Sequence, residues 1–89
     1  MHAVVVQVKV NDREGATANL RENVVPRVSQ APGFVAGYWT HSEDKSNGLG
    51  MMVFESEDAA RAAAEHVRGG DDDPVTLEGV EIREVAASA

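Results

Sequence analysis

Two apolar segments, Phe34-Val35-Ala36-Gly37-Tyr38-Trp39 and Leu49-Gly50-Met51-Met52-Val53-Phe54, decide the fold of this chain. They flank a polar connection, Ser42 to Asn47, and Asn47-Gly48 is a dipeptide typical of turns. We therefore expect a hairpin with one strand from Phe34 to Thr40 or His41 and a second from Gly48 to Phe54. Because side chains of a strand point alternately to opposite faces, both faces of this hairpin are predicted to be apolar.

This alternation predicts Phe34, Ala36 and Tyr38 on one face of the hairpin, and Val35, Gly37 and Trp39 on the other. The helices of so short a chain can cover one face of a sheet. The other, bare face is expected to carry a combination of Val5, Val35, Trp39, Met52 and Phe54. A second copy of the chain would cover that face, so we predict a homodimer through the sheet faces, with a small cavity at the junction.

The flanking segments complete the order β-α-β-β-α-β. His2 to Val10 alternates as a strand, with Val4, Val6 and Val8 on one side. A helix is expected from a capping-box-like start at Asn11-Asp12-Arg13-Glu14 to Ala31-Pro32-Gly33, with Pro26 kinking it or shifting its last turn. Ser56 is expected to cap a second helix, which stops at Gly69-Gly70. The segment Val75 to Leu77 follows Pro74, and the final strand is predicted from Val80 to Val85.

This order predicts an α+β fold of the ferredoxin-like βαββαβ type, a four-stranded antiparallel sheet with two helices on one face. With 89 residues and a mass of 9.5 kDa, residues 1–89 are expected to form a single domain. A domain of this size often gains burial by oligomerising, which is a second reason to expect a dimer.

Composition narrows the possible functions. The net charge is -7 and the eight Lys and Arg residues are dispersed, so the basic surface that nucleic acids need is not expected. No apolar run approaches the roughly 20 residues of a membrane span, and the N-terminus has no export signal pattern, so we expect neither membrane association nor export. The chain has no cysteine, which excludes disulfides and thiolate chemistry and makes the cytoplasm the default location.

The sequence resembles the dimeric α/β barrel proteins, in particular the small members similar to antibiotic biosynthesis monooxygenases. The resemblance covers the length and element order of the whole chain. The resemblance rests on four local segments: Val25-Pro26, Ala31-Pro32-Gly33-Phe34, Gly37-Tyr38-Trp39, and Met52-Val53-Phe54-Glu55-Ser56-Glu57 with Ala59-Ala60. Membership would imply one of several roles found in that superfamily: cofactor-free oxygenation of polyphenols, haem degradation, isomerisation or a stress response.

The resemblance implies candidate residues as well. The oxygenases use Asn, Trp, Tyr or His groups in the cavity between sheet and helices, and here Trp39, Tyr38, His41 and Gln7 are the candidates. The haem-degrading relatives need an Asn, a Trp and an axial His on a helix; this chain has Gln7 on its first strand and His66 in the second helical segment, so that pattern is broken.

Each candidate also has a structural interpretation. Trp39 is the only tryptophan, and it is either a packing anchor or the wall of a ligand site. His41 is predicted on the same side of the strand as Trp39. It is either a proton acceptor or a solvated hairpin residue; the first role is chemically suitable because an imidazole ordinarily titrates near pH 6.5. Tyr38 points away from Trp39, so the two are not expected to line one cavity. Met52 and its neighbour Met51 face opposite sides, one of them toward the partner or the cavity.

No metal or cofactor is expected. The histidines lack ligand spacing, and Asp71 to Asp73 lacks the pattern of a calcium-binding loop, so it is interpreted as a solvated loop. The main hypothesis is a dimeric protein that binds a small apolar or aromatic molecule and can oxidise it without a cofactor, with His41 as the catalytic residue and Trp39, Gln7, Met52 and Tyr38 around the ligand. The alternative is a non-catalytic dimeric binding or structural module whose cavity is filled by its own side chains.

Overall fold

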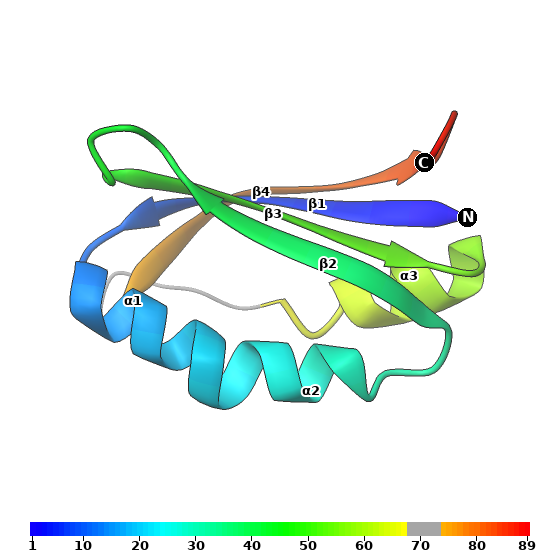
Figure 1. The fold of residues 1–89 in the computed structure, drawn as a ribbon, viewed down its shortest axis with the longest axis horizontal. Coiled ribbons are helices and arrows are strands. Elements are labelled where there is room, and N and C mark those ends of the chain that lie inside the picture. Colours follow the sequence, from blue (N-terminus) through cyan, green and yellow to red (C-terminus); the bar gives the residue numbers. More distant parts are fainter. Residues whose placement is uncertain (68–73) are drawn as a thin grey trace.

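A computed structural model describes residues 1–67 and 74–89 of the chain, and four strands in it form one antiparallel sheet. The strands are β1 (His2–Val10), β2 (Phe34–His41), β3 (Asn47–Phe54) and β4 (Val75–Glu84), in the order β2-β3-β1-β4. A long helical segment and a shorter helix lie on the same side of this open sheet (Figure 1). The α+β class, the antiparallel four-stranded sheet and the placement of both helical segments on one face agree with the sequence prediction.

The last strand is continuous. The predicted segments 75–77 and 80–85 are joined in the single strand β4, which ends at Glu84, one residue before the predicted end. Its pairing with β1 shifts between Gln7 and Val8, which pair with Gly79 and Leu77, so Glu78 is an extra residue. Such a β-bulge bends a strand without ending it, which explains why the alternating pattern breaks there while the strand continues.

The first helical segment runs without a break through α1 (Arg13–Asn19), a π-helical turn η1 (Leu20–Val24) and α2 (Val25–Ser29). The N–H of Val25 donates to the carbonyl of Leu20, the wider spacing of a π turn. Pro26 follows directly; it has no N–H to donate and its ring crowds the preceding turn, so we attribute the wide turn to this proline. The predicted disturbance at Pro26 is therefore confirmed, and it takes the form of a π turn.

The start of this helix differs from the prediction. The N-cap is Asp12, and its side chain makes no capping hydrogen bond. The expected capping box is therefore wrong. The amide of Asn11 instead donates to the hydroxyl of Thr76, and the N–H groups of Asn11 and Asp12 both donate to the carbonyl of Pro74. These bonds tie the start of the helix to the strand β4, which local sequence does not reveal.

The second helix, α3 (Glu57–Ala64), begins as predicted. The hydroxyl of Ser56 accepts from the N–H of Ala59 at 3.1 Å, which caps the helix. Its end was predicted at Gly69-Gly70, but α-helical structure stops at Ala64 and two turn residues follow. Gly69, Gly70 and the acidic stretch Asp71 to Asp73 lie outside the described residues.

The connection between β2 and β3 is held by Asp44. Its carboxylate accepts from the hydroxyl and the N–H of Ser46, at 2.7 and 3.0 Å, and from the hydroxyl of Ser42 at 2.8 Å. These bonds favour the ionised form, with those from Ser46 the strongest, and lower the pKa of Asp44 from 3.8 to about 2. Lys45 has a positive φ of 62°, which reverses the chain.

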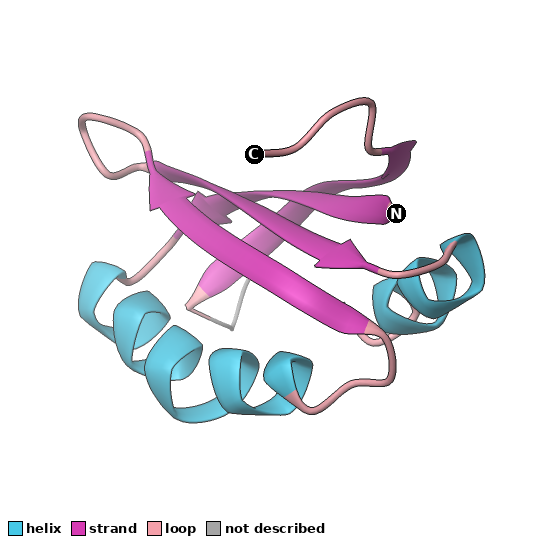
Figure 2. Ribbon diagram, turned by 45° about the vertical axis from the view of Figure 1, so that its right-hand side comes forward, coloured by secondary structure: helices cyan, strands magenta, loops and turns pink. Residues whose placement is uncertain are grey.

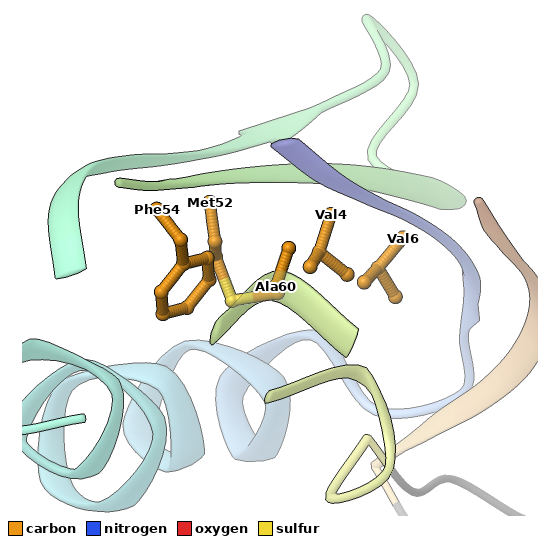
Figure 3. Close-up of a cluster of buried hydrophobic side chains, with 5 residues drawn as sticks. All are labelled: Val4, Val6, Met52, Phe54 and Ala60. Carbon is orange, nitrogen blue, oxygen red and sulfur yellow. The ribbon is translucent and has the colours of Figure 1, made fainter. Parts of the chain in front are cut away.

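The core lies between the sheet and the helices (Figure 3). It comprises Val4, Val6, Met52, Phe54 and Ala60, with the rings of Phe34 and Phe54 edge to face at a centroid distance of 5.9 Å. Met52 and Phe54 were among the residues expected on the bare face, and this expectation is wrong for both of them.

Trp39 of β2 was expected on the bare face as well, and this expectation is also wrong, because Trp39 packs on the helix-facing side. The pairing of β2 with β3 shifts between Phe34, which pairs with Phe54, and Ala36, which pairs with Val53, so Val35 is an extra residue. After this bulge Trp39 pairs with Gly50 and shares the face of Phe34. The prediction that Phe34 shares the face of Tyr38 is therefore wrong. Tyr38 and Trp39 lie on opposite faces, as predicted. The helix-free face carries Tyr38 and Met51, which are 70% and 40% exposed, around the buried Val5.

Among the described residues, no helix is long and apolar enough to cross a membrane.

Candidate functional site

A pocket of about 520 Å³ lies between the long helical segment and the helix-facing side of the sheet. Figure 2 shows this segment running beneath β2 and β3, with α3 at the other end of the sheet. The close approaches to the sheet are made by α2 against β2 and by α3 against β1, β3 and β4, whereas α1 and η1 stand further off. The apolar part of the lining includes Val6, Val8, Leu20, Val24, Trp39 and Met52.

The indole of Trp39 covers two glycines on the sheet. A Cβ on Gly37, two residues earlier in β2, would lie 2.7 Å from Cη2 of the ring, and one on Gly50, opposite in β3, would lie 2.8 Å from Cδ1. Any larger residue at either position would push the ring away. From the sequence, Gly37 was expected to mark a bulge or the close approach of a neighbouring backbone. The bulge lies at Val35 instead, and the group that approaches Gly37 is the Trp39 side chain. Because neither glycine has a side chain, the flat indole ring can lie directly against the sheet at the pocket.

Asparagines from the helical segment form a polar edge of the pocket. Asn19 ends α1 and Asn23 lies one turn later in η1, and Nδ2 of Asn23 donates to Oδ1 of Asn19 at 2.9 Å. This bond uses neither N–H of the Asn19 amide and does not use the carbonyl oxygen of Asn23. The pocket therefore offers a hydrogen-bond donor and an acceptor beside the π turn, and π turns occur frequently at functional sites.

The described residues of the lining include three basic side chains, Arg27, His41 and His66, and no carboxylate. All three are exposed, so they lie at the rim, while Val6 and Met52 are buried below. His41 is the last residue of β2 and shares the helix-facing side with Trp39. The arrangement is an apolar, aromatic floor with a polar rim, as in small-molecule sites.

The structure brings three of the five predicted site residues together: His41, Trp39 and Met52 all line this pocket. Tyr38 and Gln7 lie on the opposite, helix-free face of the sheet. Gln7 borders a shallower depression of about 310 Å³ at the hairpin end of the sheet, with Thr40 and Glu78 beside it. The prediction that Tyr38 and Trp39 do not share a cavity is confirmed.

Asn19, Asn23 and Arg27 were missed by the sequence analysis. They are spaced at four residues, so they lie along one side of the helix next to the apolar stripe of Leu20, Val24 and Val28. That spacing was the available signal. It was overlooked because polar residues beside a helical stripe are usually solvated, and local sequence does not show that α1 and η1 stand away from the sheet.

Within residues 1–67 and 74–89, no group of three His, Asp or Glu side chains is placed to hold a metal ion. Compared with models of known protein families and with curated proteins, the chain matches none. A function must therefore be argued from the pocket.

Proposed function

We propose that this protein binds a small, planar, largely apolar molecule in the pocket between the helical segment and the sheet. The observation that carries the proposal is the Trp39 ring, which is seated on Gly37 and Gly50 in an open pocket of about 520 Å³. A self-filled cavity would leave no such space: Phe54, which could have filled it, packs in the core, and Met52 lines the pocket without closing it. Exposed polar groups at the rim can orient a ligand whose ring lies against the indole.

Binding is tested by NMR. The single tryptophan gives one indole N–H resonance, and a planar probe such as 2-naphthamide should shift it. Trp39→Leu, which retains an apolar side chain, should weaken binding of the probe; a variant of the exposed Tyr38, Tyr38→Leu, should bind like the wild type. No shift of the indole resonance at millimolar probe would contradict the proposal.

We infer further that the fold is ferredoxin-like and that the chain is related to the dimeric α/β barrel proteins of the antibiotic biosynthesis monooxygenase type. The observed element order and the neighbours of each strand support this inference. So does the placement of both helical segments on one face of the sheet (Figure 1). An experimental structure of the assembled protein would test both parts of the inference.

The proposed assembly is a homodimer closed through the helix-free faces of the two sheets. Tyr38, Met51 and Leu49 are exposed on this face, and an exposed apolar patch at the centre of a sheet is a common interaction surface. Light scattering should give twice the chain mass of 9.5 kDa. Met51→Glu should favour the monomer, whereas Ala62→Glu, which adds the same charge on an exposed residue of α3, should not. A wild-type mass of one chain would refute the dimer.

The reaction that we propose for this site is oxygenation of a phenol without a metal or organic cofactor. His41 would remove the phenolic proton, because an imidazole is a suitable acceptor near neutral pH and a phenolate transfers electrons to dioxygen more readily than a phenol. For a phenol oxidised to a quinone, one oxygen atom enters the ring. The other leaves as water with two hydrogen atoms from the substrate, so the substrate supplies all the electrons. The position of His41 on the pocket rim, on the side of Trp39, supports this role.

Oxygen uptake with a panel of phenols, after treatment with a chelator, tests the reaction. His41→Ala should abolish uptake, and His66→Ala, which removes the other histidine of the lining, should retain it. Equal rates for wild type and His41→Ala would remove His41 from the mechanism.

The alternative function is ligand binding without turnover. One observation favours it: within the described part of the chain, no hydrogen bond or ion pair orients the imidazole of His41. Catalytic bases are usually held by a third group. Probe binding without oxygen uptake by the wild type would support this alternative. For either function we propose a cytoplasmic location, since a chain without cysteine needs no oxidising compartment to fold; cell fractionation tests this.

A further inference from the structure

We infer that the ligand of this pocket is an aromatic carboxylate, with the ring against Trp39 and the carboxylate at Arg27. This inference rests on the proposed binding function and names its ligand class. It starts from the charge distribution: carboxylates outnumber Lys and Arg by 15 to 8 in the chain, yet the titratable side chains among the described lining residues are Arg27, His41 and His66. The charged groups at the rim are thus basic, whereas the net charge of the protein is negative.

Arg27 is the residue of this set with a permanent charge. It lies in α2, the part of the helical segment that packs against β2, so its backbone position relative to Trp39 is defined by packing. The arginines that form ion pairs in the described residues are Arg61 with Glu57 and Arg83 with Glu81. Arg27 has no such partner there, so its guanidinium is available to a ligand.

The chemistry of the guanidinium selects the anion. Its planar array of N–H donors fits the two oxygens of a carboxylate through parallel hydrogen bonds, which are stronger than bonds between neutral groups. The rest of the pocket is apolar and aromatic, and it suits the ring of the ligand. Asn19 and Asn23 lie two turns and one turn before Arg27 on the same side of the helix, and their amides add a donor and an acceptor for ring substituents.

Two probes of the same shape test the charge preference: 2-naphthoate, an anion, and 2-naphthamide, its neutral analogue. Affinity is measured by calorimetry at pH 8 and low salt, where an ordinary histidine is neutral, and the indole N–H resonance of Trp39 reports whether binding occurs in the pocket. We expect the naphthoate to bind about tenfold more tightly, as is typical for one charge-assisted hydrogen-bonded pair. This preference should shrink at high salt, because the pair is exposed.

Arg27→Gln should remove the preference for the naphthoate and leave the affinity for the naphthamide unchanged. Arg21→Gln is the matched control: it removes the same charge from an exposed position of the same helical segment, outside the pocket lining. It should retain the preference. Both variants replace exposed residues, and thermal melting checks that they fold.

Each outcome decides the inference. A preference that persists in Arg27→Gln, or that falls equally in Arg21→Gln, would overturn the assignment to Arg27. If the wild type bound both probes with equal affinity and the indole resonance shifted, the inference that the ligand is a carboxylate would be overturned. The proposed binding function would remain intact. A failure of both probes to shift that resonance would overturn both.

Discussion

Replacing Gly50 by alanine should destabilise the protein and displace the Trp39 ring. The added Cβ would lie 2.8 Å from Cδ1 and 3.1 Å from Nε1 of the indole. Carbon atoms in contact prefer separations of about 3.5 to 4.0 Å, so the ring must retreat by roughly 0.7 to 1.2 Å. It cannot slide along the sheet toward Gly37, because the other end of the ring already covers that residue. It must therefore lift into the pocket.

The expected cost is about 1 to 3 kcal/mol of the free energy of unfolding, the usual range for adding a methyl group to a packed site. Urea unfolding followed by circular dichroism measures this cost, and the native-state fluorescence of the only tryptophan reports the ring displacement. The displaced ring also narrows the pocket, so the affinity for 2-naphthamide should fall.

Gly79→Ala is the control for this substitution. A Cβ there would meet only Oε1 of Gln7, at an ordinary contact distance of 3.8 Å. We expect stability between unchanged and about 1 kcal/mol higher, because alanine reduces the entropy of the unfolded chain. If Gly50→Ala were as stable as Gly79→Ala and kept the wild-type fluorescence, the account of the Trp39 seat would be refuted.

Three further predictions concern the scaffold. Phe54→Ala removes a fully buried ring and should cost about 3 to 5 kcal/mol in urea unfolding; a loss below about 1 kcal/mol would contradict the core described here. Ser56→Ala deletes the cap of α3 and should cost about 0.5 to 2 kcal/mol, more than Asp12→Ala at the uncapped first helix; equal costs would argue against the observed capping bond. The pKa of Asp44 measured by NMR should be about 2 instead of 3.8, so its contribution to stability is present above pH 4 and is lost as the pH falls toward 2, and a value near 4 would show that the serine hydrogen bonds do not form.

Local patterns in the sequence determined most of the secondary structure. The bounds of β1 and β2 were predicted within a residue, and β3 begins one residue before its predicted start. The cap at Ser56 and the disturbance at Pro26 were also predicted. These features depend on interactions between residues close in sequence: alternation of apolar residues, a hydroxyl at a helix start, and the missing N–H of proline. The same patterns placed Trp39 and His41 on a common face.

Only the tertiary structure decided which face that is. The extra residue at Val35 moves Trp39 to the side of Phe34, and the one at Glu78 joins two predicted segments into β4; both bulges are defined by pairing with another strand. The pocket likewise exists because α1 and η1 stand away from the sheet, which brings Asn19, Asn23 and Arg27 to the rim. Register and the spacing between layers arise from contacts between residues far apart in the chain, so no local pattern contains them.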